Sequence, residues 1–245
     1  SSMSTIYTSF GQYSTALDYE QQALKISQKI NHESLISKSL NSIGKIHADF
    51  GQYDKAIDYL QQSLKMREKL GEEKQIASCL NNIGLMYKFL KQYDKALDYY
   101  QQALKRFQHL AQERDVAASL NNIGLVYQLL KQYDKALDYL QQTVKLTQKL
   151  GQKSDLVASL NNIGGIYASL GQYEHTLEYF KQALQIAEEL QSTPDLIQSL
   201  NNLGGLYGGL GHYDKSREHL KRAIQLIESI RLQASGNLKR DYITS

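Results

Sequence analysis

A short motif that returns at a fixed interval constrains the fold of this chain more than any other feature. The motif is LNNIG or a close variant, and its five copies are 40 residues apart. A second motif, GQYDKALDYL with variations, follows each copy after the same gap and has one additional copy near the start. Such self-similarity is typical of arrays whose units pack only on their neighbours. The first motif begins at Leu40, Leu80, Leu120, Leu160 and Leu200, and the second at Gly11, Gly51, Lys91, Lys131, Gly171 and Gly211.

Each period is predicted to form two helices. In the third period, the stretch from Gln75 to Leu90 and the stretch from Tyr93 to Leu110 both carry apolar residues at helical spacing. Only Lys91 and Gln92 separate them, and so short a connection makes the two helices antiparallel neighbours. The sequence therefore predicts an all-α chain of stacked helix pairs.

The composition excludes several classes of protein. The 245 residues carry 28 basic and 25 acidic side chains, a net charge of +3, which indicates neither a nucleic-acid surface nor a membrane surface. No apolar run has the length of a membrane span or a signal peptide. The single cysteine, Cys79, cannot form an internal disulfide, so a reducing, cytoplasmic location is expected.

The repeated positions resemble the tetratricopeptide repeat (TPR), a pattern of large apolar residues, glycine, tyrosine and alanine on two helices. The resemblance implies a TPR-type α-solenoid, a right-handed superhelix of antiparallel pairs. The period of 40 in place of the usual 34, and the missing proline at the end of the second helix, imply longer helices, as in kinesin light chains and bacterial peptide-sensing regulators. In the third period the pattern is carried by Leu80, Ile83, Gly84, Tyr87, Tyr93, Ala96, Tyr100 and Ala103.

The ends of the chain depart from the repeat. Residues 1–10 are expected to be a truncated first helix with a cloning remnant, and the chain is therefore expected to be a fragment of a longer protein. Residues 232–245 are expected to be a tail that leads to a missing downstream domain. The stretch from Ala223 to Tyr242 resembles the junction between such an array and a caspase-like CHAT peptidase domain. The array itself spans 11–231, with repeats near 11–30, 34–70, 74–110, 114–150, 154–190 and 194–231.

Two rows of asparagines are predicted on the first helices. At ~100° per residue from Leu80, Asn81 lies near ~100° and Asn82 near ~200°, away from the core stripe and on the concave face of a stacked array. An exposed asparagine is a poor helix former, so its repetition indicates an interaction. A carboxamide both donates and accepts hydrogen bonds, and a ladder of them can hold an extended peptide by its backbone. The rows are Asn41, Asn81, Asn121, Asn161 and Asn201, and Asn82, Asn122, Asn162 and Asn202.

A structural alternative for the asparagines stays open. One row can bond between neighbouring first helices and so fix their stacking. The angle of ~100° argues against a purely structural role for both rows, because they cannot both face the same neighbour.

Variable positions along the groove are expected to give specificity. The groove runs from basic residues in the second repeat, through apolar residues, to glycines in the sixth. A clamp for a C-terminal carboxylate is disfavoured, because Ser78, Ala118 and Ala158 occupy the equivalents of Lys38. The predicted peptide-binding residues, besides the asparagines, are Lys38, Lys45, Leu85, Lys88, Phe89, Leu125, Gln128 and Leu129.

Catalytic and metal-binding patterns are missing from the sequence. The six histidines have no metal-ligand spacing, and Cys79 has no histidine partner in sequence, so a structural thiol is expected. The sequence thus predicts a non-enzymatic protein-binding module with no cofactor and no metal, whose ligand is a protein or peptide in the concave groove. The alternatives are a regulatory or spacer domain that docks its own downstream domain, and a peptide-pheromone sensor. End-to-end self-association of the chain is also expected, because the truncated first repeat leaves apolar residues such as Leu17 and Leu24 uncovered.

Overall fold

The computed structural model describes the backbone of residues 13–244 and the side chains of residues 14–232. Within that part the chain forms helices joined by short turns, with no strand, which confirms the predicted all-α class. The proposed truncated helix of residues 1–10 lies outside the described residues. The chain divides into two compact units, residues 1–131 and 132–245, and each is described by itself.

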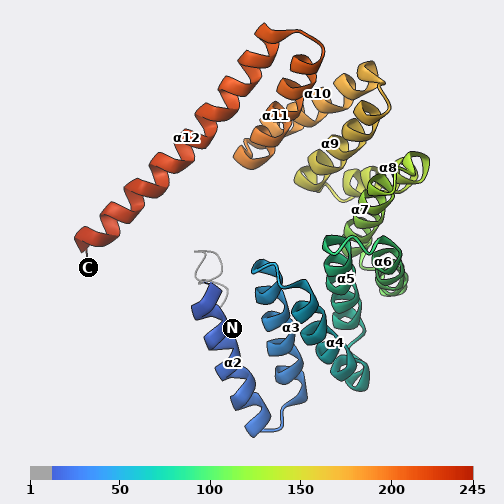
Figure 1. Ribbon diagram of the computed structural model, residues 1–245, viewed down its shortest axis with the longest axis vertical. Helices are drawn as coiled ribbons and strands as arrows, with labels where there is room; N and C mark the ends of the chain where they lie inside the picture. The colour runs from blue at the N-terminus through green and yellow to red at the C-terminus, as the bar shows by residue number, and fades with distance from the viewer. Residues whose placement is uncertain (1–12, 245) are drawn as a thin grey trace. The chain divides into compact units, whose positions relative to one another are not determined.

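In the first unit, the described residues from 13 onward form six helices that alternate in direction (Figure 1). The second helix of each pair contacts its own first helix, and it also contacts the first helix of the following pair. The helices are α2 (Tyr13–Lys29), α3 (Glu33–Asp49), α4 (Tyr53–Leu70), α5 (Glu73–Phe89), α6 (Tyr93–His109) and α7 (Glu113–Leu129).

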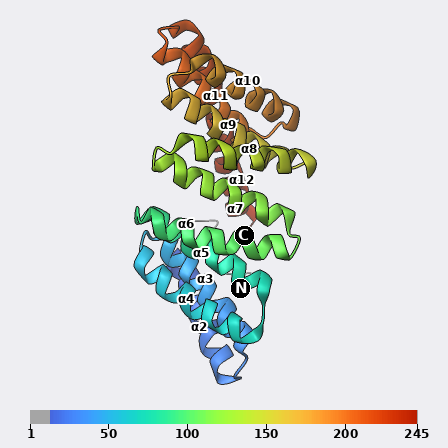
Figure 2. The same cartoon turned by 90° about the vertical axis from the view of Figure 1, so that its right-hand side faces the viewer.

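The second unit repeats this arrangement (Figure 2). Its last helix is much longer than the others, at 32 residues, and residues 232–244 continue it past the end of the sequence repeat. The helices are α8 (Tyr133–Lys149), α9 (Lys153–Ser169), α10 (Tyr173–Leu190), α11 (Thr193–Gly209) and α12 (Tyr213–Thr244).

The core is built where a helix pair meets the next first helix. In the first unit, Ala56 and Leu60 of α4 pack against Ile83 and Met86 of α5. In the second unit, Phe180 of α10 packs against Leu203 and Leu206 of α11 in the equivalent way. The predicted period of 40 residues is therefore the period of the packing.

The glycine of the LNNIG motif allows the two helices of a pair to approach closely. A Cβ atom on Gly84 would lie 2.9 Å from Cδ1 of Tyr100 and 3.2 Å from the carbonyl oxygen of Ala96. A Cβ on Gly164 would lie 2.5 Å from the ring of Phe180. Real Cβ atoms do not come so near, so these positions require a residue without a side chain.

We expect Gly164→Ala and Gly205→Ala to change stability in opposite directions. The first substitution forces the buried Phe180 ring to move and should cost about 1–3 kcal/mol. The second places a methyl group in open space on α11 and should stabilise by up to ~1 kcal/mol, the helix propensity difference. Chemical denaturation followed by circular dichroism measures both, and equal shifts would contradict the packing argument.

Helix α11 should be the weakest of the first helices. It contains four glycines, and at two of them, Gly205 and Gly209, no atom lies within reach of a Cβ, so packing does not offset the propensity loss. We expect residues 193–209 to exchange amide hydrogens faster than residues 73–89 in α5, as hydrogen exchange with mass spectrometry can measure. Equal rates in the two helices would show that packing compensates for the glycines.

Candidate functional site

The asparagine rows of consecutive first helices bond to each other. Nδ2 of Asn82 on α5 donates to Oδ1 of Asn41 on α3 over 3.4 Å. The same bond joins Asn122 to Asn81 over 3.2 Å. In the second unit it joins Asn202 to Asn161 over 3.0 Å. In these three cases the earlier first helix, α3, α5 or α9, receives an amide donor from the first helix that follows it.

These bonds change the interpretation of the two rows. The two rows lie ~100° apart around each helix, so they face different neighbours. The row that contains Asn81 faces the first helix of the following repeat, and the row that contains Asn82 faces the first helix of the preceding repeat. They meet between the helices, so both rows contribute to stacking, which the sequence argument did not foresee. Asn161 is buried, with 4% of its surface exposed, and it takes part in two of these contacts. Its Oδ1 accepts from Asn202, and its Nδ2 donates to Oγ of Ser199 over 3.2 Å.

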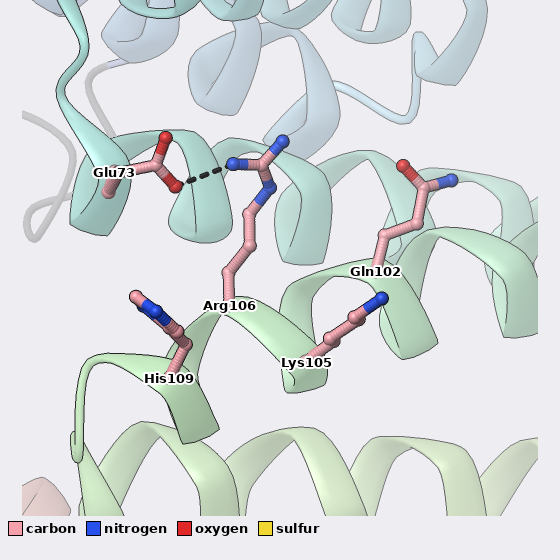
Figure 3. A pocket seen from close by; sticks show the side chains of 5 residues that line it. All are labelled: Glu73, Gln102, Lys105, Arg106 and His109. Atoms are coloured by element: carbon pink, nitrogen blue, oxygen red, sulfur yellow. Dashed lines mark hydrogen bonds and ion pairs between the residues drawn. The ribbon is translucent and has the colours of Figure 1, made fainter.

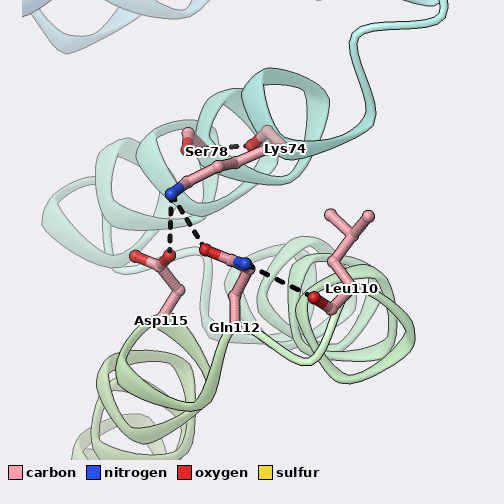
Figure 4. Close-up of polar contacts among 5 residues, drawn as sticks. All are labelled: Lys74, Ser78, Leu110, Gln112 and Asp115. Carbon is pink, nitrogen blue, oxygen red and sulfur yellow. Dashed lines mark hydrogen bonds and ion pairs between the residues drawn. The ribbon is translucent and has the colours of Figure 1, made fainter.

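The first helices are also joined near their starts. Nζ of Lys74 lies 2.9 Å from Oε1 of Gln112 and 3.9 Å from Oδ2 of Asp115 (Figure 4). In the second unit, Ser154 donates to Asp195 at the equivalent position over 2.6 Å. Two sets of polar contacts thus join α5 to α7 and α9 to α11.

A cavity of ≈ 410 Å³ opens between α3 and α5 beside the asparagines. Leu60 and Met86 are buried residues in its lining, and the ring of Tyr53 stacks on Phe89 at 4.9 Å between centroids. Phe89 remains 48% exposed and can offer its surface to a ligand. The lining residues are Lys45, Ala48, Asp49, Tyr53, Leu60, Asn82, Leu85, Met86 and Phe89.

The second unit has a cavity of ≈ 380 Å³ at the same register, between α9 and α11. Here Gly205 and Gly209 stand where Leu85 and Phe89 stand in the first unit, and Tyr173 is 48% exposed. The cavity carries no charged residue. Its lining residues are Ala168, Tyr173, Phe180, Asn201, Asn202, Gly205, Leu206 and Gly209.

The structure brings together part of the predicted site. Lys45, Leu85, Phe89 and Asn82 line one cavity, and Asn201 and Asn202 line the other. Of the remaining predicted residues, Lys38 and Leu129 are exposed, and Asn121, Asn162, Lys88, Leu125 and Gln128 are half-buried. Whether any of them binds a ligand stays a prediction.

Sequence reasoning missed the tyrosine that begins each second helix. Tyr53 and Tyr173 line the two cavities, although the sequence placed this tyrosine only in the repeat pattern. The position of this tyrosine in the sequence could have identified it. It directly follows the two-residue turn, so it must lie at the edge between the two helices of a pair.

Asp49 on α3 and Lys88 on α5 have shifted pKa values. Partial burial raises the pKa of Asp49, and Lys45 one helical turn away opposes that shift. Desolvation lowers the pKa of Lys88, whose Nζ lies 5.5 Å from the centre of the Phe89 ring. Both groups are thus held in surroundings that disfavour their charged forms.

Cys79 is a structural thiol, as expected. It is fully buried, its Sγ lies 3.6 Å from Oγ of Ser63, and burial raises its pKa. A thiol that is covered and held protonated is a poor nucleophile.

Among the described residues, no three His, Cys, Asp or Glu side chains gather in a geometry that could bind a metal. None of the described helices has the length and apolar character of a membrane span.

A separate cavity of ≈ 610 Å³ is lined by Glu73 of α5 and by Gln102, Lys105, Arg106 and His109 of α6 (Figure 3). Arg106 donates to the carboxylate of Glu73 across it, and the exposed side chains of Lys105 and His109 lie beside that pair. The guanidinium of Arg106 is therefore already paired with a carboxylate. Exposed ion pairs of this kind contribute little to the stability of the fold.

The class of protein follows from the repeated pairs and their packing. The tetratricopeptide repeat model matches residues 34–109, 75–149, 115–189 and 155–229, and the chain therefore belongs to the tetratricopeptide repeat family. Among curated proteins, none matches the chain at a significant level.

Solved structures with the same fold include several repeat proteins. BtubC (BKLC) from P. vanneervenii superposes with a TM-score of 0.76 at 18% identity, over 89% of this chain and 92% of that one. Apo RapI gives 0.72 at 20% identity, over 93% and 81%. A Rap protein complexed with competence and sporulation factor gives 0.69 at 16% identity, over 94% and 74%. Because the sequence identities are this low, the similarity to these structures shows a shared fold and nothing further.

The asparagine bridge between α3 and α5 can be tested by a double-mutant cycle. We expect Asn41→Ala and Asn82→Ala each to destabilise the chain by about 0.5–1.5 kcal/mol, the net contribution of a hydrogen bond. The double variant should lose less than the sum, because both changes remove the same bond. Additive losses in urea unfolding would show that the bond is not stabilising, and the exposed Gln102→Ala serves as a control.

Proposed function

We propose that the chain is a non-enzymatic protein-interaction module that binds an extended segment of a partner along its first helices. The observation that carries the proposal is a cavity that recurs at one register in both units, bordered by a carboxamide and floored by apolar side chains. The single buried thiol fits the reducing, cytoplasmic location that we propose with it.

The two kinds of group in each cavity match the two parts of a peptide. Buried apolar atoms with an exposed aromatic ring favour a large apolar side chain, since its transfer from water is favourable. The carboxamide of Asn82 uses one amide hydrogen on Asn41, and a second hydrogen and the oxygen's lone pairs give it capacity for a peptide unit. A segment whose side chains enter the cavities could therefore also be held by its backbone.

The structural relatives support this proposal at the level of the fold. One of them, the Rap protein, was solved in complex with competence and sporulation factor, so a solenoid of this kind can hold a protein or peptide partner.

A second candidate function is a contact with another domain of a longer protein, which would use α12. Its apolar side chains Ile224, Ile227 and Ile230 are 54%, 48% and 44% exposed and follow one another at helical spacing. Such a face is unusual for a surface that has no partner. A regulatory role of this kind would use a different surface from the cavities.

The proposal can be tested by selecting ligands and then disabling the cavity. We expect a displayed library of random 12-residue peptides to yield binders of the purified chain, measured by fluorescence polarisation. Replacing both Leu85 and Phe89 by serine removes apolar surface from the cavity between α3 and α5 and should weaken binding at least tenfold.

The control is the pair Gln102→Ser and Lys105→Ser on α6, which changes two exposed residues that line another cavity. Binding within twofold of the parent is expected for this control. A library that yields no binders, or binders that lose affinity equally with both double variants, would defeat the proposal.

A further inference from the structure

The outer face of α12 keeps the apolar pattern that interior second helices bury. In α4, α6, α8 and α10 three positions on one side of the helix are buried or half-buried, because the first helix of the following repeat covers them. On α12 the same positions are exposed, Leu220 by 37%, Ile224 by 54% and Ile227 by 48%. Their equivalents are Leu60, Leu64 and Arg67 on α4, Tyr100, Leu104 and Phe107 on α6, Leu140, Val144 and Thr147 on α8, and Phe180, Leu184 and Ala187 on α10.

This face does not have the character of an end cap. Terminal repeats of solenoids carry a polar outer face, which keeps the array soluble. On α12 Arg217 replaces Leu177 of α10, but Asp214 lies 3.7 Å from it and offsets its charge. Figure 1 shows that α12 continues past the end of α11, so a helix that packs along it could extend beyond the repeats. The apolar strip of Leu220, Ile224 and Ile227 is therefore a surface suited to another helix.

Two opposite charges flank the apolar strip on one side. Lys221 and Glu228 lie within about 60° of Ile224 on a helical wheel and ~10 Å apart along the helix axis. Both are exposed, and neither takes part in an ion pair among the described residues. Glutamine stands at both registers on α6 and α8, so the packing of a second helix does not require these charges. The glutamines are Gln101 and Gln108 on α6, and Gln141 and Gln148 on α8.

The register of Glu228 already accepts a cation from a neighbouring second helix inside the second unit. Glu188 of α10 stands at this register, and Arg222 of α12 donates to its carboxylate over 2.6 Å. A partner that supplies a cation to Glu228 would therefore continue an interface that the chain already forms. Because Lys221 lies on the same side of α12, the best partner helix also offers a carboxylate two turns away. A second α12 that runs in the opposite direction offers both.

We propose that α12 packs against α12 of a second copy of this chain, antiparallel, about a two-fold axis between residues 224 and 225. In such an isologous contact every pair of residues occurs twice, once from each copy. Lys221 then faces Glu228 of the second copy, Glu228 faces Lys221 of the second copy, and the two apolar strips cover each other. A parallel pair of helices would instead place like charges side by side, which is destabilising.

The dimer does not depend on the proposed function. The cavities lie between first helices, whereas α12 is a second helix. The inference assigns to a second copy the face that the second candidate function gives to another domain. A dimer carries two sets of cavities, so a partner with two binding segments could engage both copies with higher avidity than one copy provides.

The dimer can be tested by sedimentation velocity of the purified chain over a range of concentrations. We expect a monomer–dimer equilibrium with a dissociation constant in the micromolar range, as for other small interfaces. Replacing both Ile224 and Ile227 by serine should make the chain monomeric and leave its circular dichroism spectrum unchanged, because both residues are exposed. A parent chain that stays monomeric up to ~100 µM, or a dimer that the two serines leave intact, would overturn the inference.

Charge reversal tests the antiparallel contact itself. Lys221→Glu and Glu228→Lys each bring like charges together and should weaken association about tenfold. When the two variants are mixed, a dimer with one chain of each has opposite charges at both contacts, so association should return to within about threefold of the parent.

The matched control for charge reversal is Lys181→Glu, an exposed lysine at the register of Lys221 on α10. It should change association less than twofold. A mixture of the two reversed variants that associates no better than either alone, or equal losses from Lys181→Glu and Lys221→Glu, would overturn the antiparallel contact.

Discussion

The close approach of the two helices of a pair, at the glycine of the LNNIG motif, is the constraint on which the remaining geometry depends. The ring of Tyr100 or Phe180 lies where a Cβ of Gly84 or Gly164 would be. Because the second helix comes so near, its other face reaches the following first helix and forms the core seen between α4 and α5. The first helices can then contact one another directly, as α5 and α7 do and as α9 and α11 do.

That direct contact gives the asparagines two tasks. An amide at a helix surface would lower helix propensity without compensation. The bond from Asn82 to Asn41 supplies the compensation, and it also determines how far apart the two helices lie beside the cavity. A row that orders the stack is therefore also a row that borders the groove. The two roles are compatible because a carboxamide has more hydrogen-bonding capacity than one bond uses.

The fold could be predicted closely from the sequence because every local signal agreed with the period. The helix expected from Gln75 to Leu90 is α5, Glu73–Phe89, and the one expected from Tyr93 to Leu110 is α6, Tyr93–His109. The site could be predicted only in part. A helical wheel gives directions about one axis, so it separated the rows of Asn81 and Asn82 but could not show that the two rows of successive first helices bond to each other. The aromatic pair of Tyr53 and Phe89 was also hidden, because it joins two repeats across the stack.

A repeat architecture makes departures from the pattern more informative than the pattern itself. Identical backbone positions experience nearly the same neighbours in every repeat, so a leucine, a phenylalanine and a tyrosine at positions 60, 180 and 100 amount to a substitution experiment within one chain. Leucine and phenylalanine fill this place without a hydroxyl, so the packing does not require the hydroxyl of Tyr100. The same comparison applies to Lys88 against Ala48, Gln128 and Ala168. Lys88 and Tyr100 are therefore positions at which the third repeat departs from its neighbours beyond what packing requires.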